Sequence, residues 1–152
     1  MPVHAPDPLS TPDPLGAALR ARGQRVTPQR LVIAAAIRDL GRHTTAEEVF
    51  TEVGRRLPGV SLPTVYATLD LLEDLGLVRR VATESGTAVY DPRTDEHHHL
   101  VCRACGAIAD VDGSVDHDAL LSAARGAGFT PDGAQVVIRG LCASCRGQAS
   151  AA

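Results

Sequence analysis

The sequence predicts an α+β protein with a helical amino-terminal half that ends in a β-hairpin and a small α/β carboxy-terminal half. Three observations support this prediction. Four helix-forming segments occupy positions 15–75, two short strand-like runs follow them, and two Cys-x-x-Cys pairs bracket a further stretch of strands and helix. The chain has 152 residues, which is enough for one medium domain or two small ones.

The first two predicted helices have clear ends. Residues 15–22 form the first helix, which stops at Gly23. The second helix begins at Pro28, because Thr27 can cap its amino terminus and proline suits the first turn. It runs to Leu40. Both helices therefore have signals that do not depend on hydrophobic pattern alone.

The third and fourth predicted helices also begin at capping residues. Thr45 and Glu48 fit a capping box, which opens the third helix. Ser61 caps the fourth helix, which has Pro63 in its first turn and continues to Leu75 before a glycine. These signals predict two consecutive helices joined by a short loop.

Two strand-like runs, 77–82 and 87–90, follow the fourth helix and are joined by a turn at Ser85-Gly86. Helices followed by a two-stranded hairpin are typical of a winged helix-turn-helix domain. In such domains a helix enters the major groove of DNA, and here we expect it to be the helix before the hairpin. The pattern therefore predicts a winged-helix DNA-binding domain over residues 15–84.

The second half of the chain has a different character. It contains three predicted strands and one predicted helix, at 99–102, 108–111, 135–141 and 118–125 respectively. We expect a hinge between the two domains and short tails at both ends of the chain. The predicted limits are a disordered tail over 1–14, a hinge over 85–93, a metal-binding domain over 94–147 and a tail over 148–152.

Charge also divides the chain. Residues 15–82 contain ten Arg and seven Asp or Glu, a balance of +3, whereas residues 83–152 contain five Arg and nine acids, a balance of −4. The first fourteen residues add −2, which gives the net charge of −3. A basic half and an acidic half suggest separate tasks. The sequence shows no apolar run of transmembrane length and no signal-peptide pattern, so we expect a cytoplasmic protein without a membrane partner.

The four cysteines form two pairs with metal-ligand spacing. They are the only cysteines of the chain: Cys102, Cys105, Cys142 and Cys145. Four thiolates complete the tetrahedral shell that structural zinc prefers and leave no open position. Redox-active disulfide pairs are the alternative, but no thioredoxin-like βαβ pattern surrounds either pair.

The histidine run before the first cysteine pair suggests a second kind of metal site. His97 and His99 alternate at strand period, so both imidazoles would project from one face while His98 faces the other way. Carboxylates are frequent in the same region, and a mixed shell of imidazole and carboxylate suits Fe(II), Mn(II), Zn or Ni. Solvated loop histidines are the simpler alternative.

The chain resembles the ferric uptake regulator superfamily of bacterial metal-dependent repressors. The resemblance spans positions 15–146 and depends on four segments, RVTPQR at 25–30, SLPTVYATL at 61–69, HHHLVCRACG at 97–106 and GLCASC at 140–145. It implies that the second domain mediates homodimerisation and that the four cysteines bind structural zinc. It also implies a regulatory site for Fe(II) or Mn(II), in which Zn or Ni can substitute, with the ligands His43, Asp91, His97, His99 and Asp110.

Both carboxylates of this regulatory site are aspartates, as in the peroxide-sensing branch, whereas the iron-sensing branch usually has glutamates. The chain also resembles regulators placed beside catalase genes. The resemblance thus implies a repressor, not an enzyme, that senses hydrogen peroxide and controls oxidative-stress genes such as catalase. Peroxide would oxidise a ligating imidazole, and the candidates are His43 and His97.

The expected partner is double-stranded DNA with a palindromic operator, because a dimer presents two recognition helices. Tyr66 and Thr64 on the fourth helix are expected to contact bases, and four arginines are expected to contact phosphates or the minor groove. Those arginines are Arg20, Arg22, Arg25 and Arg30.

Two positions depart from the family pattern, and other functions remain open. Ala134 replaces a histidine of an additional metal site, and Ala67 replaces the arginine that many relatives have after Tyr66. The alternatives are an iron-responsive or other metal-uptake repressor, a metalloenzyme that uses the His/Asp group, and a zinc-stabilised interaction module without DNA affinity.

Overall fold

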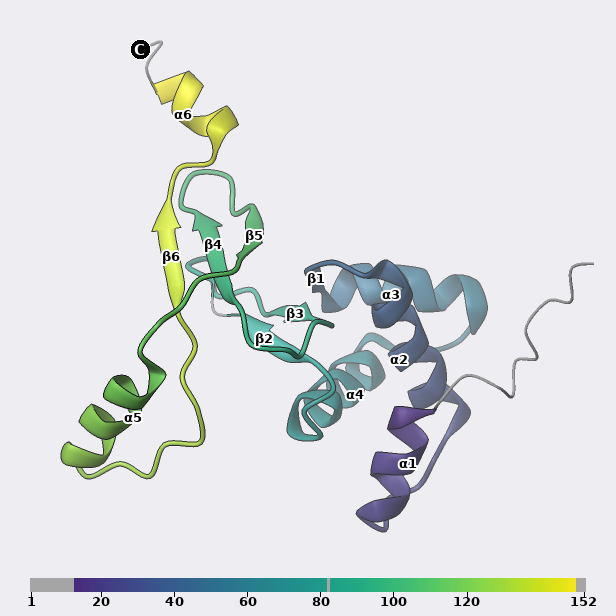
Figure 1. Ribbon diagram of the computed structural model, residues 1–152. Helices are drawn as coiled ribbons and strands as arrows, with labels where there is room; N and C mark the ends of the chain where they lie inside the picture. The colour runs from purple at the N-terminus through teal and green to yellow at the C-terminus, as the bar shows by residue number, and fades with distance from the viewer. Residues whose placement is uncertain (1–12, 82, 150–152) are drawn as a thin grey trace, which may run out of the picture.

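The computed structural model describes residues 13–81 and 83–149, which form two units joined by a short connection (Figure 1). The elements follow one another as α1 (Pro14–Ala21), α2 (Pro28–Leu40), β1 (Thr44–Thr45), α3 (Ala46–Arg56), α4 (Leu62–Asp74), β2 (Arg79–Val81), β3 (Val89–Asp91), β4 (His98–Cys102), β5 (Ile108–Val111), α5 (His117–Gly126), β6 (Val137–Gly140) and α6 (Ala143–Ala149).

The predicted starts of the helices are confirmed, because their capping residues make the expected hydrogen bonds. The backbone N–H of Glu48 donates to Thr45 Oγ1 at 3.2 Å, and the backbone N–H of Thr45 donates to Glu48 Oε2 at 2.8 Å, which completes the capping box of α3. Ser61 Oγ accepts from the backbone N–H of Thr64 at 3.3 Å at the start of α4. Gly41 ends α2 with a φ of 59°, a left-handed conformation that favours glycine.

The hydrophobic core lies in the amino-terminal unit. Helices α1 to α4 enclose buried aliphatic side chains, and the fully buried ones include Leu19, Ile33 and Leu69. The three-stranded sheet with the order β1-β3-β2 closes this core on one side through the buried Tyr90. Every residue of the buried core cluster precedes residue 91, so the carboxy-terminal unit contributes none of them.

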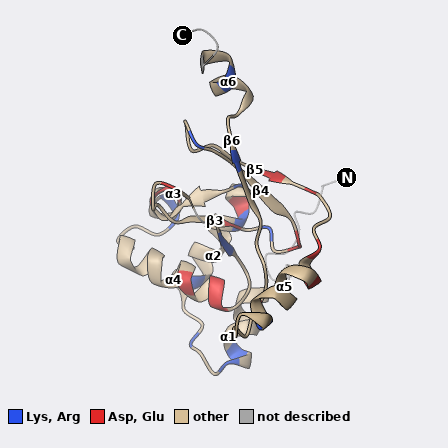
Figure 2. Cartoon of the chain, turned by 90° about the vertical axis from the view of Figure 1, so that its left-hand side faces the viewer, with Lys and Arg blue, Asp and Glu red and all other residues tan. Residues whose placement is uncertain are grey.

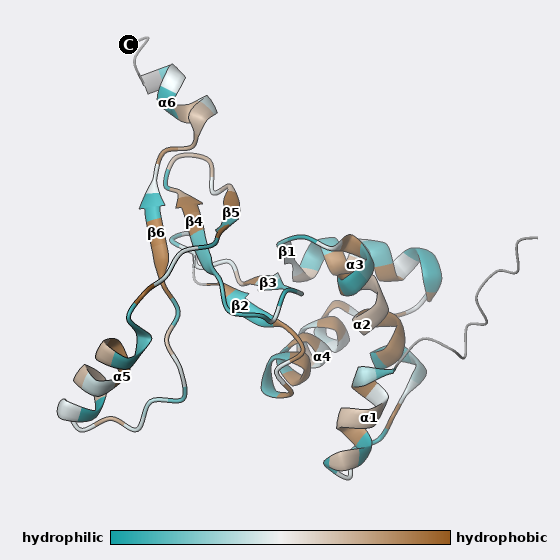
Figure 3. Ribbon diagram, viewed as in Figure 1, coloured by the Kyte–Doolittle hydropathy of each residue, from teal (hydrophilic) through white to brown (hydrophobic). Residues whose placement is uncertain are grey.

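The second unit is a three-stranded sheet with the order β5-β4-β6, in which β4 and β6 run parallel. Its helices α5 and α6 lie at opposite ends of the sheet (Figure 1). No residue of α5 is buried. Hydrophobic segments on β4, β5 and β6 have no helix over them (Figure 3).

The structure corrects several boundaries. The hairpin strands are shorter than predicted, at 79–81 and 89–91, and β1 and α6 were not predicted. β1 has only two residues, Thr44 and Thr45, which carry no sequence signal apart from the capping box. The strand predicted at 135–141 is shorter, at Val137–Gly140.

The connection between the two sheets is shorter than the predicted hinge. β3 falls inside the predicted 85–93 segment, yet it pairs with both β1 and β2 and is the central strand of the first sheet. The linking segment between β3 and β4 is therefore 92–97. Most of the predicted tails, 1–14 and 148–152, lie outside the described residues, although Asp13 already caps α1.

Candidate metal centre

The structure brings five predicted ligands together between the two sheets. One nitrogen or carboxylate oxygen from each ligand lies within 4.8 Å of the others, and the five residues are His43, Asp91, His97, His99 and Asp110. His43 precedes β1, Asp91 ends β3, and His99 stands directly opposite Asp110 across the β4–β5 pair. Both units and their connection thus contribute to one group, which we call the His/Asp site.

Three imidazole Nε2 atoms converge on two carboxylate oxygens. Asp91 Oδ2 lies 2.7 Å from His97 Nε2, 2.9 Å from His99 Nε2 and 3.4 Å from His43 Nε2. Asp110 Oδ1 lies 3.0 Å from His43 Nε2. His97, His99 and Asp91 are almost completely buried, whereas Asp110 is partly exposed.

The hydrogen bonds around this group fit a divalent cation. His97 Nδ1 faces the backbone carbonyl of Asp95 at 2.8 Å, and because a carbonyl only accepts, Nδ1 carries the proton. His97 Nε2 then faces Asp91 Oδ2 at 2.7 Å, and its lone pair is free to bind a metal ion when it carries no proton. His43 Nε2 is buried and makes no hydrogen bond within the described residues, although Asp110 is close.

The pKa directions of His99 and Asp91 agree with a neutral imidazole beside an ionised carboxylate. Burial lowers the pKa of His99, which outweighs the hydrogen bond to Asp91. Burial acts to raise the pKa of Asp91, but hydrogen bonds from His99 and from the backbone N–H of Arg93 outweigh it, so the pKa is lowered. Two carboxylates with neutral histidines would balance the charge of one divalent ion.

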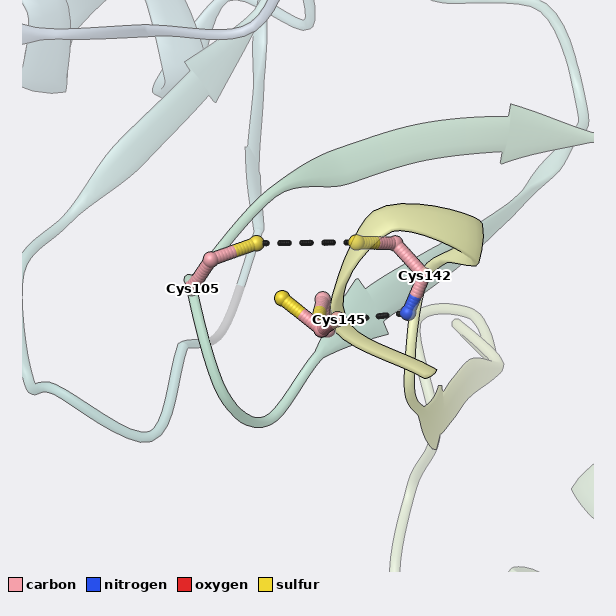
Figure 4. A group of neighbouring side chains, drawn as sticks. Cys105, Cys142 and Cys145 are labelled. Carbon is pink, nitrogen blue, oxygen red and sulfur yellow. Dashed lines mark hydrogen bonds between the residues drawn. The ribbon is translucent and has the colours of Figure 1, made fainter. Parts of the chain in front are cut away.

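The four cysteines converge in a second group, beyond the end of the second sheet. Their sulfur atoms lie within 4.8 Å of one another, and none forms a disulfide. Figure 4 shows the sulfurs of Cys105 and Cys142 facing each other, with Cys145 close by. Cys105 Sγ lies 3.8 Å from Cys142 Sγ. A tetrahedron with Zn–S distances of about 2.3 Å has S···S edges of about 3.8 Å, so the spacing suits zinc.

The cysteine group also needs a cation electrostatically. Backbone N–H groups, first that of Cys142 and then that of Cys105, lower the pKa of Cys102 to about 6, which favours its thiolate. Hydrogen bonds to the sulfurs of Cys142 and then Cys105 raise the pKa of Cys145 to about 12, because they hold the proton on its thiol. A metal ion removes this difference by holding all four sulfurs as thiolates.

A third cluster of His and Glu does not converge in the same way. His117 Nε2 lies 2.9 Å from Glu96 Oε1, but His98 Nε2 faces the carbonyl of Gly113 at 3.0 Å, and the two imidazole rings stack at 5.5 Å. Within residues 13–81 and 83–149, only the His/Asp site and the cysteine group bring three or more potential ligands together. His98 points away from His97 and His99, as the strand alternation predicts.

The expected DNA-contacting residues lie on the amino-terminal unit. Tyr66 is exposed on α4, and its hydroxyl donates to Glu47 Oε1 on α3 at 2.7 Å. Thr64 Oγ1 is bonded to Ser61 Oγ at 2.8 Å. The arginines lie on and after α1 and at the start of α2, and Figure 2 shows basic segments around α1. Arg20 is 4.0 Å from Asp13, and Arg30 Nη1 donates to the backbone carbonyl of Arg25 at 2.7 Å.

Three residues beside these sites escaped the prediction. Glu47 orients Tyr66, the carbonyl of Asp95 fixes the tautomer of His97, and Arg93 contacts both aspartates of the His/Asp site. Asp95 and Arg93 follow Asp91 closely in the sequence, which is the only signal that could have identified them. Glu47 carries no signal beyond its position in the first turn of α3.

A family model described as the ferric uptake regulator family matches residues 21–138. The transcriptional regulator FurA of Mycobacterium tuberculosis is 41% identical over 128 residues, which cover 84% of this chain and 86% of FurA.

Two solved structures share the fold. The ferric uptake regulator of Pseudomonas aeruginosa, determined with manganese, superimposes with a TM-score of 0.67 at 28% identity and covers 84% of this chain and 97% of its own. The peroxide stress regulator of Campylobacter jejuni superimposes with a TM-score of 0.61 at 28% identity. The match covers 86% of this chain and 98% of that regulator. The predicted fold class, a winged helix-turn-helix domain followed by a small α/β dimerisation domain, is thereby confirmed.

Proposed function

The chain belongs to the ferric uptake regulator family of metal-dependent transcriptional regulators, and from this premise we propose that it is a homodimeric repressor that senses hydrogen peroxide. Members of this family regulate transcription and are not enzymes, in agreement with the sequence prediction. No described helix is long and apolar enough to cross a membrane. The single observation that carries the proposal is the convergence of His43, from the helical unit, with Asp110, from the second sheet.

The His/Asp site would couple metal binding to DNA binding through the angle between the two units. His43 and Asp91 belong to the DNA-binding unit, whereas His99 and Asp110 belong to the second sheet. A site built from both units has its full ligand set in one relative orientation only, so occupancy favours that orientation. In a dimer this orientation sets the distance between the two α4 helices, which must match the half-sites of a palindromic operator.

Exposed apolar side chains of the carboxy-terminal unit support a homodimer. Leu100, Leu120, Phe129 and Ile138 are between 38% and 72% exposed. They lie on or near β4, β6 and α5, where no other described element covers them (Figure 3). Covering such side chains is favourable by about 25 cal/mol per Å² of apolar area. We assign this surface to contact with a second copy of the chain.

The chemistry of the His/Asp site supports Fe(II) or Mn(II) as the regulatory ion and zinc as the ion of the cysteine group. Imidazole and carboxylate ligands suit the former, and four thiolates suit the latter. Bound Fe(II) would supply the electron that cleaves hydrogen peroxide next to the ligating imidazoles. His43 and His97 are the candidates for oxidation, and loss of a ligand would release both the ion and the DNA.

One feature favours peroxide sensing over iron sensing. Both carboxylates of the site are aspartates, which resembles the peroxide-sensing branch of the family. The solved peroxide stress regulator and the solved ferric uptake regulator are equally identical to the chain, so the fold comparison does not separate the two functions. Regulation of oxidative-stress genes such as catalase is part of this proposal.

Mass spectrometry tests the proposal directly. Protein loaded with Fe(II) is exposed to hydrogen peroxide, digested and analysed for peptides that contain His43 or His97. We expect a gain of one oxygen atom on one of these histidines, together with loss of operator binding in a gel shift. Protein loaded with Mn(II) is the control and should keep unmodified histidines and operator binding. If the Fe(II) form loses DNA affinity only when iron is withdrawn, with unmodified histidines, the protein is an iron-responsive repressor instead.

A further inference from the structure

One residue, Arg93, holds the outer oxygen of both aspartates in the His/Asp site. Its backbone N–H donates to Asp91 Oδ1 at 2.8 Å, and its guanidinium Nη1 donates to Asp110 Oδ2 at 3.3 Å. The other oxygen of each carboxylate, Asp91 Oδ2 and Asp110 Oδ1, faces the histidines. Each aspartate thus presents one oxygen to the site and one to Arg93.

The guanidinium is itself fixed by two further carboxylates. Arg93 Nη2 lies 2.7 Å from Asp95 Oδ2 and 2.9 Å from Asp112 Oδ1, and Nε lies 2.9 Å from each oxygen of Asp95. Figure 2 shows acidic segments along β5 and the loop that follows it. Because the planar guanidinium offers five N–H donors in a rigid fork, it can serve Asp95, Asp112 and Asp110 together.

This arrangement limits how Asp110 can bind a cation. Carboxylates bind metal ions through one oxygen or through both. Asp110 is partly exposed and lies at the edge of the site, so its side chain has room to turn. A charge-assisted hydrogen bond to Oδ2 opposes that turn, because a second metal bond would replace it.

We propose that Arg93 is a positioning residue that restricts Asp110 to one ligand oxygen and thereby keeps a coordination position open for an outside ligand. The inference rests on the proposed function in one respect, namely that the His/Asp site binds a divalent ion. With one atom from each of its five residues, the site offers five donors. A six-coordinate ion then has one position left for water or for a small molecule such as hydrogen peroxide.

Of the two aspartates in the His/Asp site, Arg93→Met acts on Asp110 alone, although it also removes the guanidinium contacts to Asp95 and Asp112. It removes the guanidinium but keeps the backbone N–H that holds Asp91, so the two aspartates can be separated experimentally. Arg93→Lys keeps a cationic donor that can still reach one carboxylate. Arg79→Met is the matched control, because the Arg79 guanidinium donates to the carbonyl of Thr94 at 2.8 Å in the same connection and contacts neither aspartate side chain. The backbone of Arg79 pairs with Asp91 in the sheet, and the substitution keeps that pairing.

The experiment measures longitudinal relaxation of water protons by full-length, zinc-loaded protein with Mn(II) as the probe ion. A manganese-bound water that exchanges with solvent gives a large relaxation enhancement. We expect this enhancement in the wild type and in Arg79→Met, its loss in Arg93→Met, and retention of its larger part in Arg93→Lys. Zinc content and helical circular dichroism verify that each variant is folded.

The outcomes separate this inference from the function on which it rests. If the wild type binds no Mn(II) at the His/Asp site, the proposed function fails and the inference fails with it. If the wild type holds an exchanging water and folded Arg93→Met holds it equally well, only the role of Arg93 is overturned. If Arg93→Met does not fold, Arg93→Lys becomes the test, since that variant keeps the cation. The proposal is overturned if the relaxation enhancement of Arg93→Lys falls to the level expected without bound water.

Discussion

His43 Nε2 lies 3.0 Å from Asp110 Oδ1, although His43 precedes β1 of the first sheet and Asp110 belongs to β5 of the second. Another contact between the units, the 3.4 Å pair of Glu84 and Arg139, is exposed. Exposed ion pairs contribute about 0–1 kcal/mol each. The His/Asp site is therefore the place where binding of one ion can change the angle between the units.

Replacing His43 with alanine should uncouple metal from DNA binding. The change removes one of the two ligands of the DNA-binding unit and leaves Asp91 in that unit and His97, His99 and Asp110 beyond it. Coupling free energies between sites are typically about 1–3 kcal/mol, so we expect loss of an approximately 5–150-fold increase in operator affinity on adding Mn(II). Fluorescence anisotropy with labelled operator DNA measures this directly.

His117→Ala is the control for this substitution. It also removes an imidazole, but one that contacts Glu96 and stacks on His98 outside the His/Asp site. It should keep the metal-dependent increase in affinity. If His43→Ala still binds operator more tightly with Mn(II), His43 is not required to couple metal binding to DNA binding.

Loss of zinc should unfold the carboxy-terminal unit but spare the helical unit. Among the described residues, the buried hydrophobic side chains of the second unit are only Val101 and Cys102. Binding of structural zinc to zinc-finger peptides contributes about 10–16 kcal/mol, which exceeds what such a small core can supply. We expect Cys142→Ser to lose zinc and to become monomeric while keeping most of its helical circular dichroism.

Ser144→Ala provides the matched control within the same Cys-x-x-Cys pair, because Ser144 is exposed between the two ligands. It should keep zinc and the dimer, as measured by elemental analysis and sedimentation velocity. A dimeric Cys142→Ser protein without zinc would show that the second unit folds on packing alone.

The parts of the fold that sequence reasoning captured are those with local causes. The capping box of Thr45 and Glu48 and the cap at Ser61 predicted the starts of α3 and α4, because each cap is a hydrogen bond within one turn. β1 was missed because a two-residue strand is defined by its partner β3 rather than by its own residues. β3 fell within the predicted hinge for the same reason.

In the candidate site, too, only the features with a local cause were predicted from the residues themselves. Strand alternation predicted that His97 and His99 share a face, and the structure places both against Asp91. His43 and Asp110 were joined to them only through the resemblance to a family, because the register that brings two sheets together is a tertiary property. Arg93 was not predicted, since its role depends on the side-chain positions of Asp110 and Asp112.

Tyr66 should contribute to operator recognition through its ring. The side chain is exposed on α4, where Glu47 fixes its hydroxyl. If the ring contacts a base edge, Tyr66→Ala should weaken binding to the operator by about 1–3 kcal/mol and leave nonspecific DNA binding nearly unchanged. Tyr66→Phe keeps the ring and should lose less. Both variants should change the free energy of unfolding by less than about 0.5 kcal/mol, because the residue is on the surface.

Competition binding with operator and random DNA, together with urea unfolding, measures both quantities. An equal loss of affinity for the two DNAs would show that Tyr66 contributes no sequence recognition. A loss of stability greater than that of other surface substitutions would assign Tyr66 a structural role through Glu47 instead.

Arg25 should contribute to DNA affinity without regard to sequence. It is exposed before α2 and forms no ion pair with any residue in the ranges 13–81 and 83–149, so its charge is available to phosphate. Arg25→Ala should reduce the slope of log affinity against log salt by about 1 and weaken operator and random DNA alike. Titrations at several salt concentrations measure the slope.

Arg56→Ala removes the same charge from a guanidinium that is already engaged, at 2.7 Å from Asp39 and 2.8 Å from Glu52. Because those carboxylates neutralise Arg56, its loss should leave the salt slope nearly unchanged. A slope that falls equally in both variants would indicate a general effect of net charge, whereas an unchanged slope in Arg25→Ala would place Arg25 away from the DNA backbone.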